Sequence, residues 1–458
     1  MNNRSLPSKP SLSADEQKVF QWATAIFLSI ILDGATRKWL LPPSLQAIPY
    51  FAKDLLAAIF VLAYPINDRY QWAPRLGRYI LAIAVLLAPA FVMGLAEVPL
   101  GAIVVYKNAV LWPLFAVCLG QRLTERVVQR LLKLLLVCSI GMACLAVVQY
   151  NSGRGSILNR YAWGEEATAE FLRGIAVAGD FVRATGTFSY ITGLAAFSLA
   201  TFSIFLGRSL SLARGRDLLS ASIGVASAVV CGLASGNRSV QVFMLAVGTA
   251  SLILAPKQKR YTSRLVGGLL SAAVMVIVIW NTSISKGVVG RWAGTDQDYF
   301  RGRVTGSTTG QPVSEILRGN PFGRGLGIYS GFATLNGATD RLNLAYNEGS
   351  NSRVAVETGI VGFGAIALGF GFILRAASWM SKIRNPALKT RLIPVFAGIL
   401  IALFLGVWYD HNATALWWWT IGIWLGEGLA IPRFGLNREF VWARQMQRRL
   451  TVSARQTS

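Results

Sequence analysis

Apolar segments of bilayer-crossing length recur along the chain, separated by polar or basic connections. A transmembrane helix needs about 20 mostly apolar residues to cross the hydrocarbon core. This rule predicts spans at 18–33, 49–66, 77–96, 100–119, 130–149, 187–207, 217–235, 239–256, 264–281, 352–375, 391–409 and 413–432. The predicted fold class is therefore all-α, a polytopic membrane bundle of about twelve transmembrane helices.

The basic residues of the connections alternate along this map and indicate an orientation. Every second connection contains several Lys or Arg residues, beginning with Arg69, Arg75 and Arg78 after the second span. The short connections near Glu97 and Asp410 contain none. Because basic loops stay on the cytoplasmic side of a membrane, the pattern predicts that both termini are cytoplasmic.

Composition supports a membrane protein and excludes a soluble one. Hydrophobic residues make up 53% of the chain and charged residues 14%, whereas soluble domains carry about 25% charged residues. The net charge of +24 could indicate nucleic acid as a partner, but the basic residues lie between apolar spans, as membrane orientation requires. With one histidine and four cysteines in no paired spacing, the sequence predicts neither a metal site nor a cofactor.

The spans divide the chain into five parts. These are a cytoplasmic segment (1–16), the first nine spans (17–281), a large outer loop (282–351), the last three spans (352–432) and a basic cytoplasmic tail (433–458). Ser13 and Glu16 have the spacing of a helix capping box. In the tail, 435–450 has the pattern of a basic amphipathic helix, which we expect to lie on anionic membrane lipid.

Two outer segments, 150–186 and 282–351, are longer than simple connectors. The second is rich in glycine and arginine and includes Arg291. A basic loop suits an anionic ligand, and phosphate is the natural candidate because arginine binds it through two parallel hydrogen bonds. The alternative is a solvated loop whose arginines pair with its own acidic residues.

Local patterns in and beside these segments favour binding. Arg183 opens the sequence Arg-Ala-Thr-Gly-Thr-Phe before a span, and Arg238 ends a Ser-Gly-Asn-Arg turn between two spans. Four glycines accompany Arg324 within 319–327. These glycines could let backbone N–H groups approach a phosphate or sugar, or they could simply form turns.

A further pattern leads out of the large loop. Residues 346–353 include Glu348 and Arg353, and Glu357 follows about two turns into the next predicted helix. A carboxylate within a membrane span is a functional candidate by default.

Other charges fall inside or beside the spans. Asp33 and Arg37, which precede Lys38, are spaced to form an ion pair on one helix face. Lys53 and Asp54 are predicted to lie near the outer surface, as interfacial residues.

The spans also contain polar and aromatic residues whose roles have more than one interpretation. Lys107 is deeper and is expected to face a polar interior. His411 could cap or hydrogen-bond, or it could transfer protons. The tryptophans 417–419 are expected at the interface between helix and lipid, with contact to a substrate as the less favoured alternative.

Taken in order, these motifs resemble the bacterial O-antigen ligase and polymerase superfamily of membrane glycosyltransferases. The resemblance covers roughly 130–430 and rests on Arg183–Phe188, Ser235–Arg238, Asn320–Gly327 and Glu348–Gly362. It implies a helical bundle in the bacterial inner membrane, with 282–351 as a periplasmic loop over a lateral cavity.

Family members transfer a glycan from a polyprenyl-diphosphate carrier to an acceptor without nucleotide sugar or metal. The resemblance implies that Arg238 binds the diphosphate, with Arg324 or another loop arginine as the second contact. Where ligases carry a histidine, nine residues before a Glu-x-Gly, this chain has Glu348. This departure favours a polymerase of O-antigen or exopolysaccharide with Glu348 as catalytic base. The expected substrate-binding residues are Arg183, Arg238, Arg324, Arg291 and Arg353.

Three other functions remain open at this stage. The chain could be an O-antigen ligase, a transporter or flippase of lipid-linked glycan, or a non-catalytic relative with an assembly role. The expected partners are a polyprenyl-diphosphate-linked oligosaccharide and membrane lipid, with a flippase and a chain-length regulator by family analogy.

Overall fold

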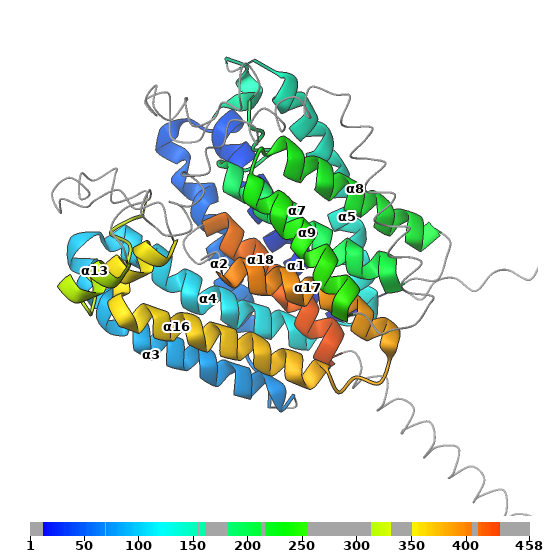
Figure 1. Cartoon of the computed structure of the whole chain (residues 1–458). Helices are drawn as coiled ribbons and strands as arrows, with labels where there is room; N and C mark the ends of the chain where they lie inside the picture. Colours follow the sequence, from blue (N-terminus) through cyan, green and yellow to red (C-terminus); the bar gives the residue numbers. More distant parts are fainter. Residues whose placement is uncertain are drawn as a thin grey trace, which may run out of the picture.

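The described part of the chain is all-helical. A computed structural model describes residues 12–68, 70–153, 155–160, 182–211, 216–254, 313–330, 350–404 and 411–430, and these contain no strand. Eight of the described helices are long and apolar enough to cross a membrane. The all-α class and the membrane character predicted from the sequence are thereby confirmed (Figure 1).

The helices follow one another with short connections. The first group comprises α1 (Ala14–Ala35), the π-helix η1 (Thr36–Leu40), η2 (Pro43–Leu45), α2 (Ala47–Ala63), α3 (Trp72–Glu97), α4 (Pro99–Arg122), α5 (Glu125–Asn151) and η3 (Ile157–Asn159). The second group comprises α7 (Ile191–Ser211), α8 (Arg216–Ala234), α9 (Arg238–Leu254), α13 (Val313–Gly319), α16 (Ser350–Met380), α17 (Pro386–Phe404), α18 (His411–Leu425) and the π-helix η5 (Gly426–Ala430).

Most predicted spans coincide with described helices. The predicted spans 49–66 and 239–256 correspond to the shorter helices α2 and α9, which have 17 residues each. The span 413–432 corresponds to α18 and η5, and 264–281 lies outside the described residues. The total of about twelve spans therefore stays a prediction.

The capping box predicted at the start of α1 is confirmed. The Ser13 hydroxyl accepts from the Glu16 N–H at 3.3 Å, and the Glu16 carboxylate accepts from the Ser13 N–H at 2.9 Å. The same carboxylate accepts from the Thr124 hydroxyl at 2.7 Å. The cap thus joins the start of α1 to the residue that precedes α5.

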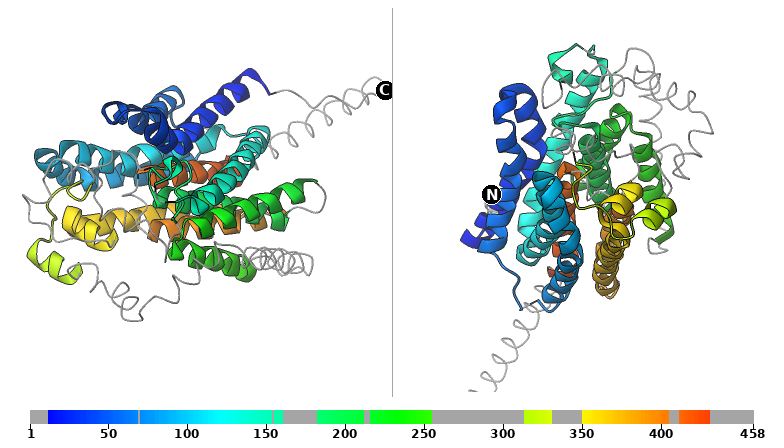
Figure 2. Two further views of the ribbon diagram at one scale, coloured as in Figure 1. Left: turned by 90° about the horizontal axis from the view of Figure 1, so that it is seen from above. Right: turned by 90° about the vertical axis from the view of Figure 1, so that its left-hand side faces the viewer.

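Helix α18 lies at the centre of the bundle. It packs against α1, α4, α7 and α17, and all of its residues are buried. Figure 2 shows α1 and α2 on one side of the molecule and α8 and α9 on the other. The lipid-facing position predicted for Trp417, Trp418 and Trp419 is therefore wrong, because helices surround α18. The Trp419 ring stacks on Phe27 at 4.5 Å, and its indole N–H donates to the Ala23 carbonyl.

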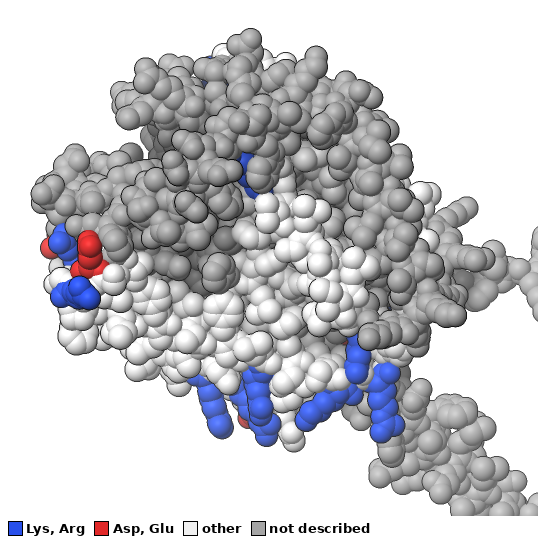
Figure 3. Space-filling model, viewed as in Figure 1, with Lys and Arg blue, Asp and Glu red and all other residues white. Residues whose placement is uncertain are grey.

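The bundle has two chemically distinct ends. The loop end contains α13 and the first turns of α2, α4, α7, α16 and α18. The opposite, basic end contains the starts of α3, α5, α8 and α17. Figure 3 shows Lys and Arg side chains gathered along the lower edge of the molecule, where α3, α16 and α17 lie in Figure 1. Arg208 of α7 and Arg391 of α17 both pair with Glu427 of η5 at this end. The basic loops predicted to share one face therefore do so within the described residues.

Helix α16 is broken at Gly359, and the segment 319–330 fills the break. Gly359 has φ 59° and ψ −146°, a conformation that essentially only glycine adopts. The break frees the carbonyls of Val356 and Glu357, which accept from the Arg324 and Gly325 N–H groups at 2.8 and 2.9 Å. The loop thus supplies the hydrogen bonds that a continuous helix would have made.

We expect Gly359→Ala to destabilise the protein by about 1–3 kcal/mol, because the backbone conformation is strained for any L-residue. The added Cβ would also meet the carbonyl of Pro321. Thermal unfolding of the purified protein in detergent measures the loss. Gly141→Ala is the control, since nothing lies within 4 Å of a Cβ there; equal midpoints for the two variants would contradict the expectation.

Candidate functional site

The structure brings two of the sequence motifs together at the loop end. The Arg183 Nε donates to the Ser235 carbonyl at 3.2 Å, and the Ala184 N–H donates to the Ala234 carbonyl at 3.0 Å. These bonds join the segment before α7 to the turn between α8 and α9. The turn carries Arg238, so the two arginines predicted from separate motifs belong to one local structure.

The turn itself is built as its sequence predicts. Gly236 has φ 60°, and the Ser235 hydroxyl accepts from the Asn237 N–H at 3.2 Å. The Asn237 carboxamide accepts from the Ser239 N–H at 3.1 Å, which caps the start of α9. Arg238 is the first residue of α9 and is half-buried, as is Arg183. Hydrogen bonds therefore fix the backbone from which each of the two arginine side chains extends.

Two residues with no predicted role, Lys38 and Gln149, hold the segment 185–188 in place. Lys38 Nζ donates to the Thr185 hydroxyl at 3.0 Å and to the carbonyls of Gly186 and Phe188 at 2.9 and 2.8 Å. The Gln149 carboxamide accepts from the N–H groups of Thr185 and Gly186. Lys38 was visible only as one of several interfacial charges, and Gln149 gave no signal in the sequence.

The candidate residues of the large loop lie on a second part of the loop end. Arg324 is exposed, and its backbone N–H bonds to Val356, three residues beyond Arg353 on α16. The structure thus places the backbone of Arg324 beside the first turns of α16. Arg291 and the proposed base Glu348 lie outside the described residues.

The glycines around Arg324 serve packing rather than a phosphate cradle. Gly323, Gly325 and Gly327 all have positive φ and press against the backbones of α16, α3 and α4. The Gly325 N–H bonds to the Glu357 carbonyl, and the Leu326 N–H bonds to the Ala90 carbonyl. Of the two interpretations of this motif, the turn cluster is the one that the contacts support.

Glu357 secures the same loop. Its side chain is fully buried, and Oε1 accepts from the Tyr329 N–H at 3.0 Å. The Gly327 backbone also hydrogen-bonds to this carboxylate. The sequence made Glu357 a functional candidate because its carboxylate lies inside a span. In the structure, this carboxylate holds the loop that carries Arg324.

Glu357→Gln tests this assignment, because the amide oxygen can still accept from the Tyr329 N–H. We expect this variant to keep a melting temperature close to that of the wild type, whereas Glu357→Leu should lower it clearly because the Tyr329 N–H loses its acceptor. Thermal unfolding of the two purified variants in detergent measures the difference. A glutamine variant as unstable as the leucine variant would show that the negative charge itself is needed.

A buried charge cluster lies deeper, between α1, η1, α2, α4 and α18. We use this name for Asp33, Arg37, Lys53, Asp54, Lys107, His411 and Asn412. Asp33 Oδ2 lies 3.2 Å from Lys53 Nζ, 3.0 Å from Asn412 Nδ2 and 3.6 Å from a nitrogen of Arg37. The predicted pair of Asp33 and Arg37 is confirmed.

Asp54 is the second anion of the cluster. Its carboxylate lies 2.5 Å from Lys107 Nζ and accepts from the Trp112 indole at 3.1 Å. The interfacial position predicted for Lys53 and Asp54 is wrong, because α2 turns these residues toward α1 and α4 and both are buried. Each charge has an opposite charge within ion-pair distance, which offsets the cost of removing it from water.

His411 lies beside Lys107 and Asp54, and it shares the Tyr50 carbonyl with Lys53, which belongs to the Asp33 part of the cluster. Its Nδ1 lies 3.0 Å from Lys107 Nζ, and its Nε2 lies 3.0 Å from the Tyr50 carbonyl. An ammonium offers only donors and a carbonyl only accepts, so Nδ1 accepts and Nε2 carries the proton. The hydrogen-bonding role predicted for His411 and the polar interior predicted for Lys107 are both confirmed.

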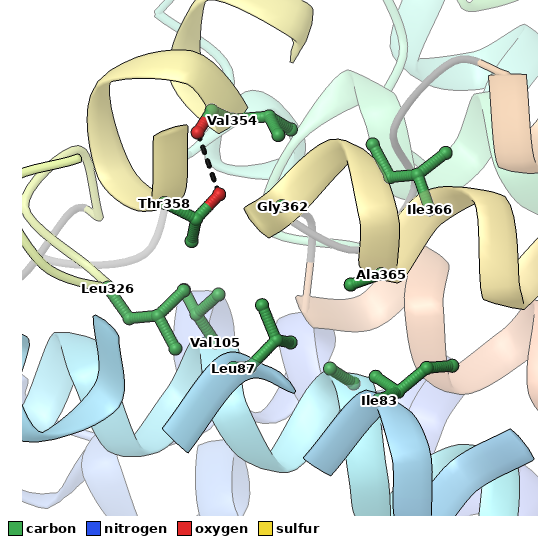
Figure 4. Close-up of a pocket in the computed structure, with 10 residues that line it drawn as sticks. Ile83, Leu87, Val105, Leu326, Val354, Thr358, Gly362, Ala365 and Ile366 are labelled. Carbon is green, nitrogen blue, oxygen red and sulfur yellow. Dashed lines mark hydrogen bonds between the residues drawn. The ribbon is translucent and has the colours of Figure 1, made fainter. Parts of the chain in front are cut away.

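An apolar pocket lies beneath the loop 319–330, between α3, α4 and α16 (Figure 4). Its walls include Ile83 and Leu87 of α3, Val105 of α4, and Leu326 of the loop. The Thr358 hydroxyl donates to the Val354 carbonyl at 2.8 Å, so this polar group already has a partner. The lining suits a hydrocarbon group.

No protein-family model matches the chain, and the search of curated proteins found no match.

Proposed function

We propose that this chain is a membrane glycosyltransferase that polymerises polyprenyl-diphosphate-linked oligosaccharide repeat units into O-antigen or exopolysaccharide. The observation that carries the proposal is the bond between Arg183 and the turn of Arg238. It fixes two arginines at one end of an apolar bundle. Two cations held by buried backbone suit a diphosphate, which carries its charge on several oxygen atoms. The reaction takes place at the periplasmic face of the bacterial inner membrane, with both termini in the cytoplasm.

The arginines act on the leaving group. As the bond between the sugar C1 and the phosphate oxygen breaks, negative charge builds on the departing diphosphate. Guanidinium groups already in position stabilise that charge more in the transition state than in the bound donor. Arg324, Arg291 and Arg353 supply further positive charge from the large loop and from α16.

The acceptor hydroxyl forms the new bond to C1 and loses its proton as it attacks. Glu348 is the base in this proposal and receives that proton. Attack from the side opposite the leaving group inverts the anomeric centre. The energy comes from the donor's own glycosyl–phosphate bond, so the reaction needs neither nucleotide nor metal.

The apolar pocket under the loop also suits a lipid-linked donor. Its lining is hydrocarbon, and it lies between α3 and α16, whose outer faces expose Val85 and Ile360. These exposed apolar side chains indicate contact with lipid. A donor that approaches from the bilayer can therefore place apolar carrier units near the backbone of Arg324 and Arg353, which belong to the loop and the helix that line this pocket.

The test is incubation of the purified protein with polyprenyl-diphosphate-linked repeat units, without nucleotide and with a metal chelator, followed by gel analysis. A ladder of lengthening chains supports the polymerase. Transfer of single units to an added lipid acceptor, without lengthening, would instead identify a ligase. Donor that remains unchanged under both conditions contradicts a glycosyltransferase.

One observation favours a second candidate, a transporter of lipid-linked glycan. Lys53, Asp54 and Lys107 lie inside α2 and α4, and ionisable groups within spans often mark a transport path. Proteoliposomes that contain the fluorescent lipid-linked donor distinguish the two functions. Movement of the donor between leaflets, without any change in its length, would favour the transporter.

The orientation has its own test. In a variant without the four native cysteines, a single cysteine at 286 should react with a membrane-impermeant maleimide in intact cells, and one at 382 should react only after the membrane is permeabilised. Labelling of 286 only after permeabilisation would place the large loop in the cytoplasm, away from the periplasmic substrate, and would contradict the proposal.

A further inference from the structure

Lys38 holds a backbone segment in an unusual way. It is the third residue of η1, it is buried, and its ammonium meets three oxygen atoms of the segment 185–188 at 2.8 to 3.0 Å. An ammonium has three N–H donors, so these oxygen atoms match its full donor capacity. Desolvation of the charge is thus offset by bonds to a single segment.

Gln149 grips the same segment from α5. Its Oε1 accepts from the N–H groups of Thr185 and Gly186 at 3.2 and 2.7 Å. Its Nε2 donates to the Gly186 carbonyl at 3.0 Å and to the Leu158 carbonyl at 2.8 Å. Lys38 and Gln149 therefore share the Gly186 carbonyl and hold the segment from two helices at once.

The contact with α1 leaves the segment little freedom. A Cβ on Gly34 would meet the backbone of Thr187, Phe188 and Ser189, so the two backbones touch directly. The Thr187 hydroxyl donates to the Ile31 carbonyl, and Arg37 donates to the Ser189 hydroxyl at 3.2 Å. The path from α1 to this segment is a continuous set of short contacts.

The segment leads directly to the arginine pair. Arg183 lies two residues before Thr185, and its Nε is bonded to the Ser235 carbonyl of the turn that carries Arg238. The Ala184 N–H adds a second bond to the same turn. A shift of residues 185–186 would therefore move Arg183 through the backbone. It would move the turn of Arg238 through the two hydrogen bonds.

We infer that Lys38 and Gln149 are positioning residues, which hold the segment 185–188 so that Arg183 and the turn of Arg238 present their guanidinium groups together to a diphosphate. This inference rests on the proposed function for the identity of the ligand. It assigns Lys38 no contact with substrate, since its three donors are taken by the protein. The effect of Lys38 on binding must then pass through Arg183.

The test compares Lys38→Met with the wild type, using farnesyl diphosphate as the probe. The methionine side chain is unbranched and only one atom shorter than lysine, but it cannot donate a hydrogen bond. Lys133→Met is the control, because Lys133 is exposed near the basic end. We expect Lys38→Met to weaken binding of the probe about tenfold and the control to leave it unchanged. Hydrogen exchange at the amides of Thr185 and Gly186 should become faster in Lys38→Met only.

A double variant distinguishes positioning from general damage. If Lys38 acts through Arg183, adding Lys38→Met to Arg183→Ala should weaken binding no further, whereas independent effects would multiply. Multiplied losses would overturn the inference, and so would faster exchange in Lys38→Met with unchanged binding. A wild-type protein that does not bind the probe would count against the proposed function instead.

If Lys38→Met does not yield folded protein, a milder variant, Thr185→Val, tests the same inference. Thr185→Val removes one of the three acceptors of Lys38 and leaves the charge in place. We expect a loss of binding in the same direction but smaller, about threefold, again without further loss when Arg183→Ala is added. Unchanged binding in Thr185→Val, together with unchanged amide exchange, would overturn the inference.

Discussion

Arg238→Ala should reduce chain lengthening by about 100-fold or more while the bundle stays folded, and Arg183→Ala should do the same. Each change removes a fixed positive charge from the site where the proposed leaving group gains negative charge. Both side chains are half-buried at the loop end, so Arg238→Ala should leave the melting temperature nearly unchanged, and Arg183→Ala should cost only its hydrogen bond to the Ser235 carbonyl, about 1 kcal/mol. Product length on gels with the lipid-linked donor measures the effect.

Two controls sharpen this expectation. Arg75→Ala removes an exposed arginine of α3 at the basic end and should behave as wild type. Arg238→Lys keeps the charge but loses the planar fork that binds two phosphate oxygens, so its activity should fall between wild type and alanine. Alanine variants that still lengthen chains at the wild-type rate would remove both arginines from the reaction.

The second large effect is expected on stability, at Asp33. Its carboxylate is shared by Lys53, Asn412 and Arg37 in the apolar core, where the loss of one charge leaves opposite charges behind. Asp33→Ala should therefore destabilise the protein by about 3–5 kcal/mol. The yield of monodisperse protein and its melting temperature in detergent both report this loss. Asp68→Ala, an exposed aspartate between α2 and α3, is the matched control.

A second substitution, at Lys53, tests whether the loss of stability in Asp33→Ala comes from an unpaired buried charge. Lys53 loses its closest anion in Asp33→Ala, so adding Lys53→Met removes a charge that has become costly. We expect the double variant to recover part of the lost stability, because apolar replacements of a buried pair are often nearly neutral. A double variant less stable than Asp33→Ala would show that the two side chains do not act as a pair.

The sequence predicted the positions of the helices better than it predicted which helices pack together. Span positions follow from apolar length, and the two ends of the bundle follow from the placement of basic residues, because both depend on local composition. The capping box at Ser13 and the pair of Asp33 and Arg37 are local as well, and both are confirmed. The burial of Trp417–Trp419 was not predictable, since it depends on which helices surround α18.

The site shows the same division. Arg183 and Arg238 each stand out in a local motif, but nothing in the spacing shows that the two motifs meet. Gln149 hides within an apolar helix, and its role appears only when the segment after Arg183 folds back onto α5. The glycines around Arg324 fit a phosphate loop as well as a packed turn, and only the opposing backbones decide between the two.

The position of α18 also constrains how the molecule can be made. It is the last described α-helix in chain order, yet it packs against α1, α4 and α7, which leave the ribosome about 200 residues earlier or more. Until α18 is made, the Phe27 ring lacks its stacking partner Trp419, and the Asp33 carboxylate lacks the hydrogen bond from Asn412 and keeps only its early partners Lys53 and Arg37. The centre of the bundle is therefore completed only after its surrounding helices have been made, and a chain that ends before His411 would lack the helix that α1, α4, α7 and α17 pack around.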